Sequence, residues 1–403
     1  MRTGLLHDAV IAPALHPEQL PGDHRVVTRV FALTDVGRYR EHNEDTFLVA
    51  DLTTGTSLDF ANGYHEITAD PHGLLFLVAD GMGGAASGEL ASSMAGSLVL
   101  EALRETWTPA DPSPEAFAAA LRDATILANA RIHQHAREHP EHRGMGTTAT
   151  IAGLLGDRLF MVQVGDSRAY MVRSGDVKQL TKDQSLMQRL VEAGELTAEE
   201  AEVSERRNII LQALGPEAHV TIDLTHQQVC RGDTLILCSD GLSGLVRASE
   251  IARTAIEEQD LRSLCKRLID RANQLGGPDN ITVIAARFDG DGLSTSGHGD
   301  AFGYNTFPLA GTLNDDTRET PAPGREARST LRSDPTPRYG TPLPSRAFLE
   351  EEFTRAQPME DLALLGAPEP IVEERRRAVQ PVFLMLGLIA LCAIFWFLFA
   401  LFG

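Results

Sequence analysis

Acidic side chains lie next to short apolar, strand-like segments at several places in this chain of 403 residues. Each has a glycine beside or close to it. The acids are Asp80 after segment 74–79, Asp166 after 159–164, Asp240 after 234–239, Asp279 before 281–284, and Glu44 and Asp45 before 46–49. A single Asp-Gly after a strand usually makes a turn. Several together would gather carboxylates at one rim, where they repel one another and lose hydration.

Such carboxylates stay ionised only if positive charge lies among them. The sequence supplies no cluster of lysine or arginine, and Arg40, four residues before Glu44, is the one close candidate. Metal ions therefore account for the pattern. The ligands would be oxygen atoms, with no cysteine and no obvious histidine, which favours Mg²⁺ or Mn²⁺ over zinc or copper. Gly81 lacks a Cβ, so its backbone can approach a metal and offer its carbonyl.

Two metal ions about 4 Å apart can share a water molecule and make it hydroxide-like near neutral pH. The substrate must then present an electrophile to that water. The Arg40 guanidinium suits a bidentate contact with phosphate oxygens. Together these residue types predict hydrolysis of a phosphate ester.

The elements that would position these residues are mixed. Apolar runs separated by short turns predict strands over 28–34, 46–50, 74–79, 147–155, 159–164, 169–173, 177–180, 234–239 and 281–288, and helices over 86–106, 114–138, 185–193 and 259–275. Strands at hairpin spacing with grouped helices indicate an α+β fold of packed layers rather than alternating β-α-β units. Residues 51–72 have the pattern of a long surface hairpin.

The motifs, taken in order, resemble those of the metal-dependent protein phosphatase family (the protein phosphatase 2C type) in its bacterial form. The matching pieces are Arg40-Glu41-His42-Asn43-Glu44-Asp45, Val78-Ala79-Asp80-Gly81-Met82-Gly83-Gly84, Gly146-Thr147-Thr148, Val164-Gly165-Asp166-Ser167-Arg168-Ala169-Tyr170, Leu237-Cys238-Ser239-Asp240-Gly241-Leu242 and Gly277-Pro278-Asp279-Asn280-Ile281-Thr282. Any one piece is weak evidence, whereas six in the family order are specific. They cover about residues 26 to 288.

The resemblance implies two packed antiparallel β-sheets flanked by helices, with metal ions in a cleft at one end. It implies two Mn²⁺ or Mg²⁺ ions per active site. In that scheme Asp80 bridges both ions and Gly81 gives a carbonyl. Asp240 and Asp279 complete one ion's shell, while Glu44 and Asp45 act on the other, partly through water. Asp166 matches the ligand of a third, weaker ion, and Arg40 matches the phosphate-binding arginine. The catalytic set is then Arg40, Asp80, Asp240 and Asp279, and the substrates are phosphoserine and phosphothreonine in proteins.

Three positions depart from the family pattern. Met82 stands where eukaryotic members often carry a histidine thought to protonate the leaving group, so no general acid is assigned. Gln184 replaces a histidine in the segment 181–185, and Gln212 stands where arginine is common. Residues 181 to 219 correspond to the family's mobile flap, so substrate preference there is open.

The chain divides into four parts by composition: an N-terminal extension (1–25), a phosphatase domain (26–288), a linker rich in Pro, Thr and Ser (289–377) and a C-terminal helix (378–403). The linker composition is typical of disorder. Residues 381–403 contain no charge, and a helix of that length is roughly 35 Å long, enough to cross a bilayer. Arg375, Arg376 and Arg377 precede it and predict a cytoplasmic domain on an inner or plasma membrane.

The net charge of −20 argues against nucleic acid as a partner. The expected partners are phosphorylated proteins, Ser/Thr kinases and their substrates, and the membrane through the C-terminal helix. Two other functions stay open. One is a degenerate fold that binds phosphoproteins without turnover, which the full set of acids disfavours. The other is a phosphatase for a small ester, for which the sequence supplies no dedicated pocket.

Four histidines cluster in the segment 130–143, at positions 133, 135, 139 and 142. His135 and His139 stand four residues apart and could share one face of a helix. A solvated helix end is the favoured explanation of the cluster.

Overall fold

The computed structural model describes residues 25–68, 72–108, 112–204, 206–295 and 301–309. These all belong to the first of the two compact units into which the chain divides, residues 1–319. The predicted membrane helix, most of the predicted linker and the N-terminal extension to residue 24 lie outside the described residues. Within the described ranges, no helix is both long and apolar enough to cross a membrane.

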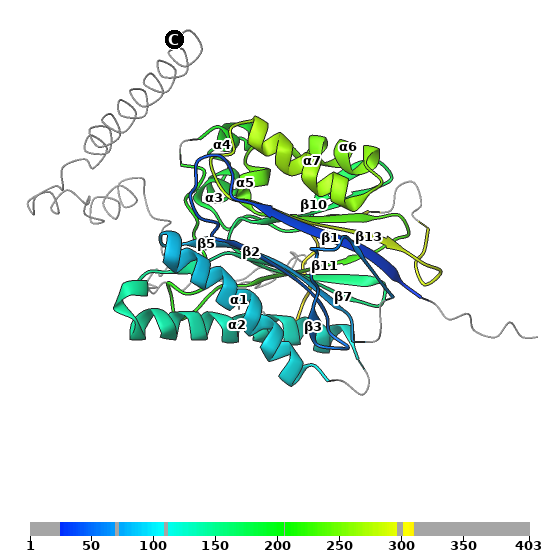
Figure 1. The fold of residues 1–403 in the computed structure, drawn as a ribbon, viewed down its shortest axis with the longest axis horizontal. Helices are drawn as coiled ribbons and strands as arrows, with labels where there is room; N and C mark the ends of the chain where they lie inside the picture. Colours follow the sequence, from blue (N-terminus) through cyan, green and yellow to red (C-terminus); the bar gives the residue numbers. More distant parts are fainter. Residues whose placement is uncertain (1–24, 69–71, 109–111, 205, 296–300, 310–403) are drawn as a thin grey trace, which may run out of the picture. The chain divides into compact units, whose positions relative to one another are not determined.

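Two antiparallel sheets form the centre of the described domain (Figure 1). The first has the strand order β10 (Asp176–Gln179), β9 (Arg168–Arg173), β12 (Thr234–Cys238), β13 (Ile281–Asp289), β1 (Val27–Asp35) and β4 (His65–Thr68). The second has the order β11 (Asp223–Gln228), β8 (Arg158–Val164), β7 (Ala149–Leu155), β5 (Leu74–Met82), β2 (Asp45–Asp51) and β3 (Thr56–Ser57), and β6 (Gly146–Thr147) pairs with β5. The predicted α+β architecture of two packed antiparallel sheets is confirmed.

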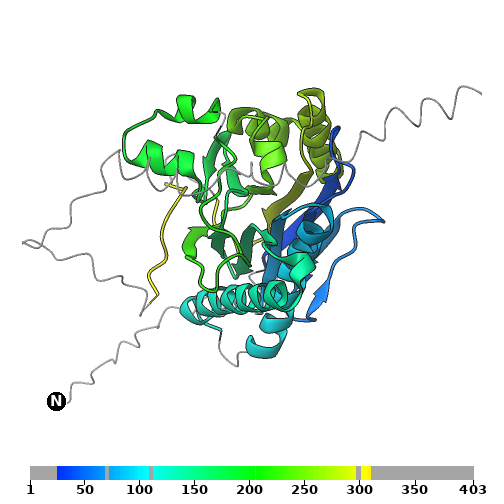
Figure 2. The ribbon, with the colours of Figure 1, turned by 90° about the vertical axis from the view of Figure 1, so that its left-hand side faces the viewer.

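Helices cover the outer face of each sheet. α1 (Ala85–Thr106) and α2 (Pro114–Glu138) lie on the second sheet, and α6 (Ala248–Glu257) and α7 (Leu261–Gln274) lie on the first. Figure 2 shows these two pairs on opposite sides of the sheets. The short helices α3 (Leu186–Glu192), α4 (Ala198–Glu202) and α5 (Asp240–Ser243) and the 3₁₀ turn η1 (Pro140–His142) complete the described elements.

Alternation along β5 explains how the layers pack. Leu74, Phe76 and Val78 belong to the core between the two sheets, whereas Leu75 and Leu77 face the core under α1 and α2. Because successive side chains of a strand point to opposite faces, the next even-numbered residue, Asp80, lies on the face between the sheets. A run of apolar residues buried on both faces thus delivers a carboxylate to the inner layer.

Strand β5 continues two residues beyond Asp80, although the sequence predicts that it ends there. The extension exists because β6 pairs with it: Gly81 faces Thr147 and Met82 faces Gly146. The backbone around Asp80 is therefore held on both sides.

Residues 301–309, inside the predicted linker, pack against the domain. Thr306 forms a β-bridge with Thr225, the Phe307 amide donates to the Leu224 carbonyl at 2.8 Å, and Leu309 is buried. The packed domain extends at least to Leu309.

Candidate active site

The predicted acids converge at one end of the two sheets, from five separate segments. Asp45 opens β2 and stands directly opposite Asp80 of β5 in the strand register. Asp166 lies in the turn between β8 and β9, and Asp240 begins α5 directly after β12. Asp279 lies in the turn before β13. The structure thus brings together residues separated by more than two hundred positions.

Burial and mutual repulsion raise the pKa values of four of these carboxyl groups, those of Asp45, Asp80, Asp166 and Asp240. Burial, with Asp240 and Asp279 close by, raises the pKa of Asp45 to about 7 despite hydrogen bonds from Thr282 and Ser239. Burial and the charge of Asp240 raise the pKa of Asp166 to about 8.

The other two central acids respond in the same way. Burial raises the pKa of Asp80 well above its ordinary value, and Asp45 and Asp240 add to the shift. Burial and Asp279 raise the pKa of Asp240, although it shares a hydrogen bond with Asp80. So many carboxyl groups in mutual contact form a site whose ionised state needs added positive charge.

Two buried oxygen atoms of this site lack a hydrogen-bond donor, Asp45 Oδ1 and Asp166 Oδ1. Buried polar atoms are nearly always paired, so these two are available as ligands. An all-oxygen donor set with unpaired carboxylate atoms fits Mg²⁺ or Mn²⁺. As the side chains stand, no three His, Cys, Asp or Glu residues in the described ranges already surround a common point that would hold an ion. The individual ligand assignments stay predictions.

Arg40 reaches the acids from the loop between β1 and β2. One of its terminal nitrogens donates to Asp279 Oδ2 at 2.9 Å, and about half of the arginine side chain is exposed. Asp279 Oδ1 accepts from the amide of Asn280 at 2.9 Å. The predicted phosphate-binding cation therefore lies beside a predicted metal ligand, at the solvent side of the site.

Glu44 and Gly81 lie together where β2 and β5 meet. The Gly81 amide donates to the Glu44 carbonyl at 3.1 Å, and the Ser92 hydroxyl of α1 donates to the same oxygen at 2.6 Å. A Cβ on Gly81 would collide with the backbone of Gly88 and with the Glu44 carbonyl. Glycine is thus required for close approach of β5 to α1, a packing reason that stands beside the predicted carbonyl ligand. Burial raises the pKa of the Glu44 carboxyl group.

Polar residues without an assigned role in the sequence analysis hold this site together. Asn280 is buried; its side-chain amide donates to the carbonyls of Val36 and His42, and its oxygen accepts from the Glu44 amide at 2.8 Å. It thereby fastens the loop that carries Arg40 to the turn that carries Asp279. The sequence feature that could have identified Asn280 as a site residue is its position next to Asp279 in the Gly-Pro-Asp-Asn motif.

Hydroxyl groups fix the two facing aspartates. The Ser239 hydroxyl donates to Asp45 Oδ2 at 2.7 Å. The Asp80 amide donates to the Thr148 hydroxyl at 2.9 Å, and the Asp80 carbonyl accepts from the Thr147 hydroxyl at 2.9 Å. Thr147 and Thr148 belong to the third of the motifs that resemble the family pattern. Their contacts with Asp80 give this motif a positioning role.

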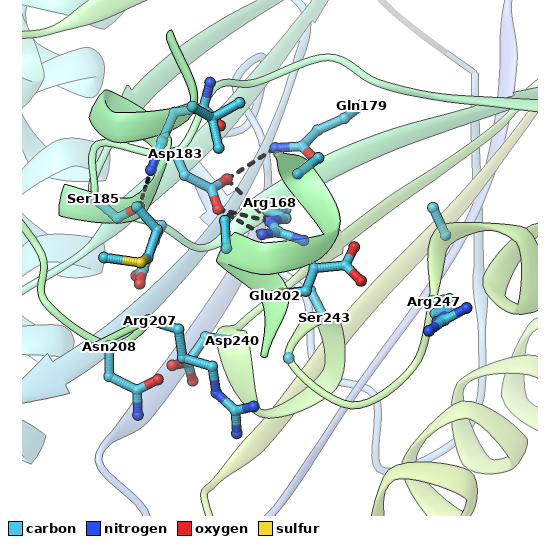
Figure 3. A pocket seen from close by; sticks show the side chains of 18 of the residues that line it. Arg168, Gln179, Asp183, Ser185, Glu202, Arg207, Asn208, Asp240, Ser243 and Arg247 are labelled. Carbon is cyan, nitrogen blue, oxygen red and sulfur yellow. Dashed lines mark hydrogen bonds and ion pairs between the residues drawn. The ribbon is translucent and has the colours of Figure 1, made fainter. Parts of the chain in front are cut away.

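A pocket of about 530 Å³ opens beside the acids (Figure 3). Two of the predicted metal ligands, Asp166 and Asp240, line it. The other lining residues include Arg168, Asp183, Glu202, Arg207, Asn208, Ser243 and Arg247. It lies between the segment 181–219, which corresponds to the flap, and the α5–α6 turn. Its position lets it receive a group attached to a phosphate held at the acids.

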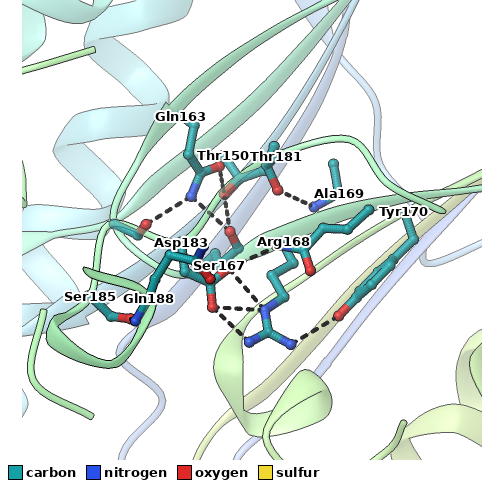
Figure 4. A network of polar contacts seen from close by, with 12 residues as sticks. Thr150, Gln163, Ser167, Arg168, Ala169, Tyr170, Thr181, Asp183, Ser185 and Gln188 are labelled. Carbon is teal, nitrogen blue, oxygen red and sulfur yellow. Dashed lines mark hydrogen bonds and ion pairs between the residues drawn. The ribbon is translucent and has the colours of Figure 1, made fainter. Parts of the chain in front are cut away.

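Arg168 and Arg207 correct the expectation that Arg40 is the one cation near the acids. The charges of Arg168 and Arg207 both favour ionisation of Asp240 and lower its pKa against the effect of burial. Arg168 is already engaged: it donates to both oxygens of Asp183, at 2.6 to 3.0 Å, and to the Tyr170 hydroxyl at 3.1 Å (Figure 4). Arg207 is exposed and lies on the pocket wall.

Two antiparallel sheets with paired outer helices and a rim of buried carboxylates define a metal-dependent hydrolase of the phosphatase type. The family model described as Protein phosphatase 2C matches residues 62–281. This chain belongs to the protein phosphatase 2C family.

Relatives with printed activities agree with this assignment. A serine/threonine phosphatase, stp, of Listeria monocytogenes is 36% identical over 256 residues, which cover 64% of this chain and 94% of that protein. The serine/threonine protein phosphatase PstP of Mycobacterium tuberculosis is 41% identical over 214 residues, which cover 53% of this chain and 40% of that protein.

Solved structures give the same fold. The crystal structure of the Mycobacterium tuberculosis phosphatase PstP/Ppp has a TM-score of 0.54 at 34% identity and covers 65% of this chain and 99% of that one. The PstP catalytic domain in complex with two manganese ions has a TM-score of 0.52 at 34% identity, covering 66% of this chain and 99% of that one.

Proposed function

We propose that this chain is a metal-dependent protein serine/threonine phosphatase that uses a pair of Mn²⁺ or Mg²⁺ ions. The observation that carries the proposal is the convergence of Asp45, Asp80, Asp166 and Asp240, whose pKa values are raised, with Asp279 at the same rim and two unpaired buried oxygens among them. Family membership and the activities of the relatives support the same function.

The predicted ligands of the pair are Glu44, Asp45, Asp80, Gly81, Asp240 and Asp279, and Asp166 is the predicted ligand of a third, weaker ion. When bound, the ions supply Lewis-acid polarisation of the phosphoryl group and a lowered pKa for water. The Asp80 backbone donates to the Thr148 hydroxyl and accepts from the Thr147 hydroxyl, and the Asp45 carboxylate accepts from Ser239, so both acids are held in place before any ion arrives. This preorganisation lowers the reorganisation needed on binding.

Arg40 binds the phosphate oxygens of the substrate. In the structure its guanidinium contacts Asp279 and remains half exposed, so it can exchange that contact for a phosphate group without leaving the rim. The pocket beside Asp166 and Asp240 then accepts the peptide next to the phosphorylated residue. Met82 offers no proton, so the leaving alkoxide takes one from water or from another group, and no general acid is assigned.

The test is phosphate release from a phosphothreonine peptide by the full chain and by a truncated protein ending at Leu309. Each is assayed with Mn²⁺, with chelator and as the Asp279→Ala variant. Turnover that requires both the metal and Asp279 is expected. Metal binding and phosphopeptide binding without turnover would establish the binding-module function instead. Turnover of small aryl phosphates with no turnover of phosphopeptides would favour a small-ester substrate.

We also propose that the protein acts at the inner face of a membrane, against Ser/Thr kinases. The support is the uncharged segment 381–403 after three arginines, which lies outside the described residues. Deleting residues 378–403 should move the protein from the membrane fraction to the soluble fraction and leave activity in vitro unchanged. If the shortened protein stays with the membrane fraction, the anchor is elsewhere.

A further inference from the structure

Three imidazole rings gather where α2 ends, on a surface that the phosphatase reaction does not use. His135 lies in the last turn of α2, His139 is the residue that caps it, and His142 ends the 3₁₀ turn η1. The ring centroids of His135 and His139 lie 4.2 Å apart, and those of His135 and His142 lie 5.1 Å apart, both stacked. The helical spacing of four residues and the tight turn after it place all three rings on one side.

The ring nitrogens of this cluster are already close to a ligating separation. His135 Nε2 and His142 Nδ1 lie 2.9 Å apart. Two nitrogens bound to one tetrahedral Zn²⁺ at about 2.05 Å lie roughly 3.3 Å apart. The present separation is that of a hydrogen bond between the two rings, so an ion would replace this hydrogen bond and the rings would turn to point both nitrogens at it.

Glu141 orients the third ring. His139 Nδ1 lies 3.6 Å from Glu141 Oε1, an ion pair when the ring is protonated. A carboxylate hydrogen-bonded to one ring nitrogen fixes the tautomer and leaves the other nitrogen as the ligand, and Glu141 would take this role on moving slightly closer to His139. His139 Nε2 is then the third donor.

The state of His135 suits a metal ligand. Burial lowers its pKa, and the nearby rings of His139 and His142 lower it further. A lowered pKa favours the neutral ring, which is the form that binds metal. Around it, Glu138 and Glu141 are the acids that counter this shift.

We propose that His135, His139 and His142 form a second metal site, separate from the carboxylate centre, that binds a transition-metal ion of the Zn²⁺ class. Three nitrogen donors select such ions over Mg²⁺ and Mn²⁺, for which the oxygen-rich centre is suited. The rings lie stacked rather than aimed at one point, so binding turns the side chains while α2 and η1 keep their backbone hydrogen bonds, His139 to His135 and His142 to His139.

The ion would fasten η1 to α2. Only Arg143, Gly144 and Met145 separate His142 from β6, and β6 pairs with the end of β5 beside Asp80. The Met145 amide also donates to the His142 carbonyl at 3.1 Å. Binding at the histidines should therefore slow hydrogen exchange in residues 139–147 and raise the thermal midpoint.

The experiment counts Zn²⁺ on the full chain after chelator treatment and dialysis against buffered Zn²⁺ with saturating Mn²⁺. Four proteins are compared: the unchanged chain, His135→Gln/His142→Gln, His133→Gln and Asp279→Ala. His133 is the matched control, since it is two residues from His135 and its Nδ1 contacts the Gly215 carbonyl at 2.8 Å on another face of α2. The double variant should lose one equivalent of Zn²⁺, and the two controls should keep it.

Affinity provides the second readout. Removing a residue that only supports a ligand weakens metal binding roughly 10- to 100-fold, so loss of two ligands should weaken it at least as much. Equal Zn²⁺ content in the double variant would overturn the proposal, as would loss of the same equivalent in Asp279→Ala, which would place the ion at the carboxylate centre. If the double variant fails to fold by circular dichroism, His139→Gln, at an exposed position, carries the same test with a roughly 10-fold weaker affinity expected.

Discussion

At the scale of single residues, the active site is a set of carboxylates that the fold holds close against their repulsion. The acids themselves could be predicted from the sequence because each stands at the edge of an apolar strand. Their supports could not. Asn280 contacts Glu44 across 236 positions and Ser239 contacts Asp45 across 194, and neither pairing leaves a local pattern in the chain.

Replacing Arg40 tests the phosphate contact. Arg40→Ala should raise KM for a phosphothreonine peptide roughly 10- to 100-fold and lower kcat less, because a charge-assisted hydrogen bond contributes about 1.5–3 kcal/mol to ground state and transition state alike. Steady-state kinetics give both constants. Arg40→Lys keeps the charge, so its KM should lie between that of the unchanged chain and that of Arg40→Ala. Because Arg40 contacts Asp279, the Mn²⁺ dependence of each variant is measured as a control for an indirect effect on metal binding. An unchanged KM in Arg40→Ala would mean that Arg40 does not bind the phosphate.

Replacing Asp166 tests the electrostatics of the metal-free site. Its pKa rises from the ordinary 3.8 to about 8 in the folded protein. The folded state therefore holds an extra proton between roughly pH 4 and 8, and stability falls as pH rises through this window. Asp166→Asn removes this pH-dependent loss of stability. In chelator, the free energy of unfolding of the variant should therefore exceed that of the unchanged chain by an amount that grows between pH 5 and pH 8.5, to on the order of a few kcal/mol.

Thermal unfolding of both proteins in chelator measures this difference at each pH. Saturating Mn²⁺ is the control, because positive charge at the acids should shrink or reverse the advantage of the asparagine. An advantage that is the same at pH 5 and pH 8.5 would mean that Asp166 is already ionised in the metal-free fold.

At the scale of elements, helix α2 and the buried strands follow the sequence pattern closely. The helix predicted over 114–138 has those bounds, since Ser113 caps it by accepting from the Ala116 amide and Pro114 opens it. β5 ends three residues beyond its predicted range of 74–79, because the pairing with β6 depends on a segment more than sixty positions away. Local patterns specify where an element can form, and distant partners decide where it stops.

The Asn129 side chain of α2 contacts the end of the flap segment where that segment returns to the core. Asn129 is buried; its amide donates to the carbonyls of Glu217 and Ala218, and its oxygen accepts from the Gly215 amide at 2.8 Å. Asn129→Ala leaves these backbone groups without a partner and should cost roughly 1–3 kcal/mol. The thermal midpoint should fall by several degrees, at about 2–4 °C per kcal/mol.

Hydrogen exchange separates a local effect from a global one. In Asn129→Ala the amides of Gly215, Glu217 and Ala218 should exchange faster than those in the strands of the core. Thr125→Val is the matched control, one turn earlier on α2, because the Thr125 hydroxyl donates to Leu121 within the helix. Faster exchange at 215–218 in the control as well would assign the effect to α2 rather than to Asn129.

At the scale of the whole molecule, composition misjudged where the domain ends. Residues 289–309 are rich in Gly, Ser and Asp, and the sequence assigns them to the linker. Yet Leu293 and Leu309 are buried, Phe307 packs edge-on against Phe160 with centroids 5.2 Å apart, and the Tyr304 hydroxyl donates to Asp223 at 3.0 Å. A few buried apolar side chains are enough to pack a polar segment against the domain. The average composition of the segment does not reveal them.

The seated segment predicts a difference between two truncated proteins, one ending at Gly290 and one at Leu309. Full burial of a leucine or phenylalanine side chain contributes about 1.5–3 kcal/mol, so loss of Leu293, Phe307 and Leu309 should remove several kcal/mol of stability. The shorter protein should unfold at a clearly lower temperature and still release phosphate when cold, since none of the predicted metal ligands lies beyond Asp279. Scanning calorimetry with and without Mn²⁺ makes the comparison. Because both proteins lack residues 310–403, equal midpoints would show that the segment adds nothing to the domain.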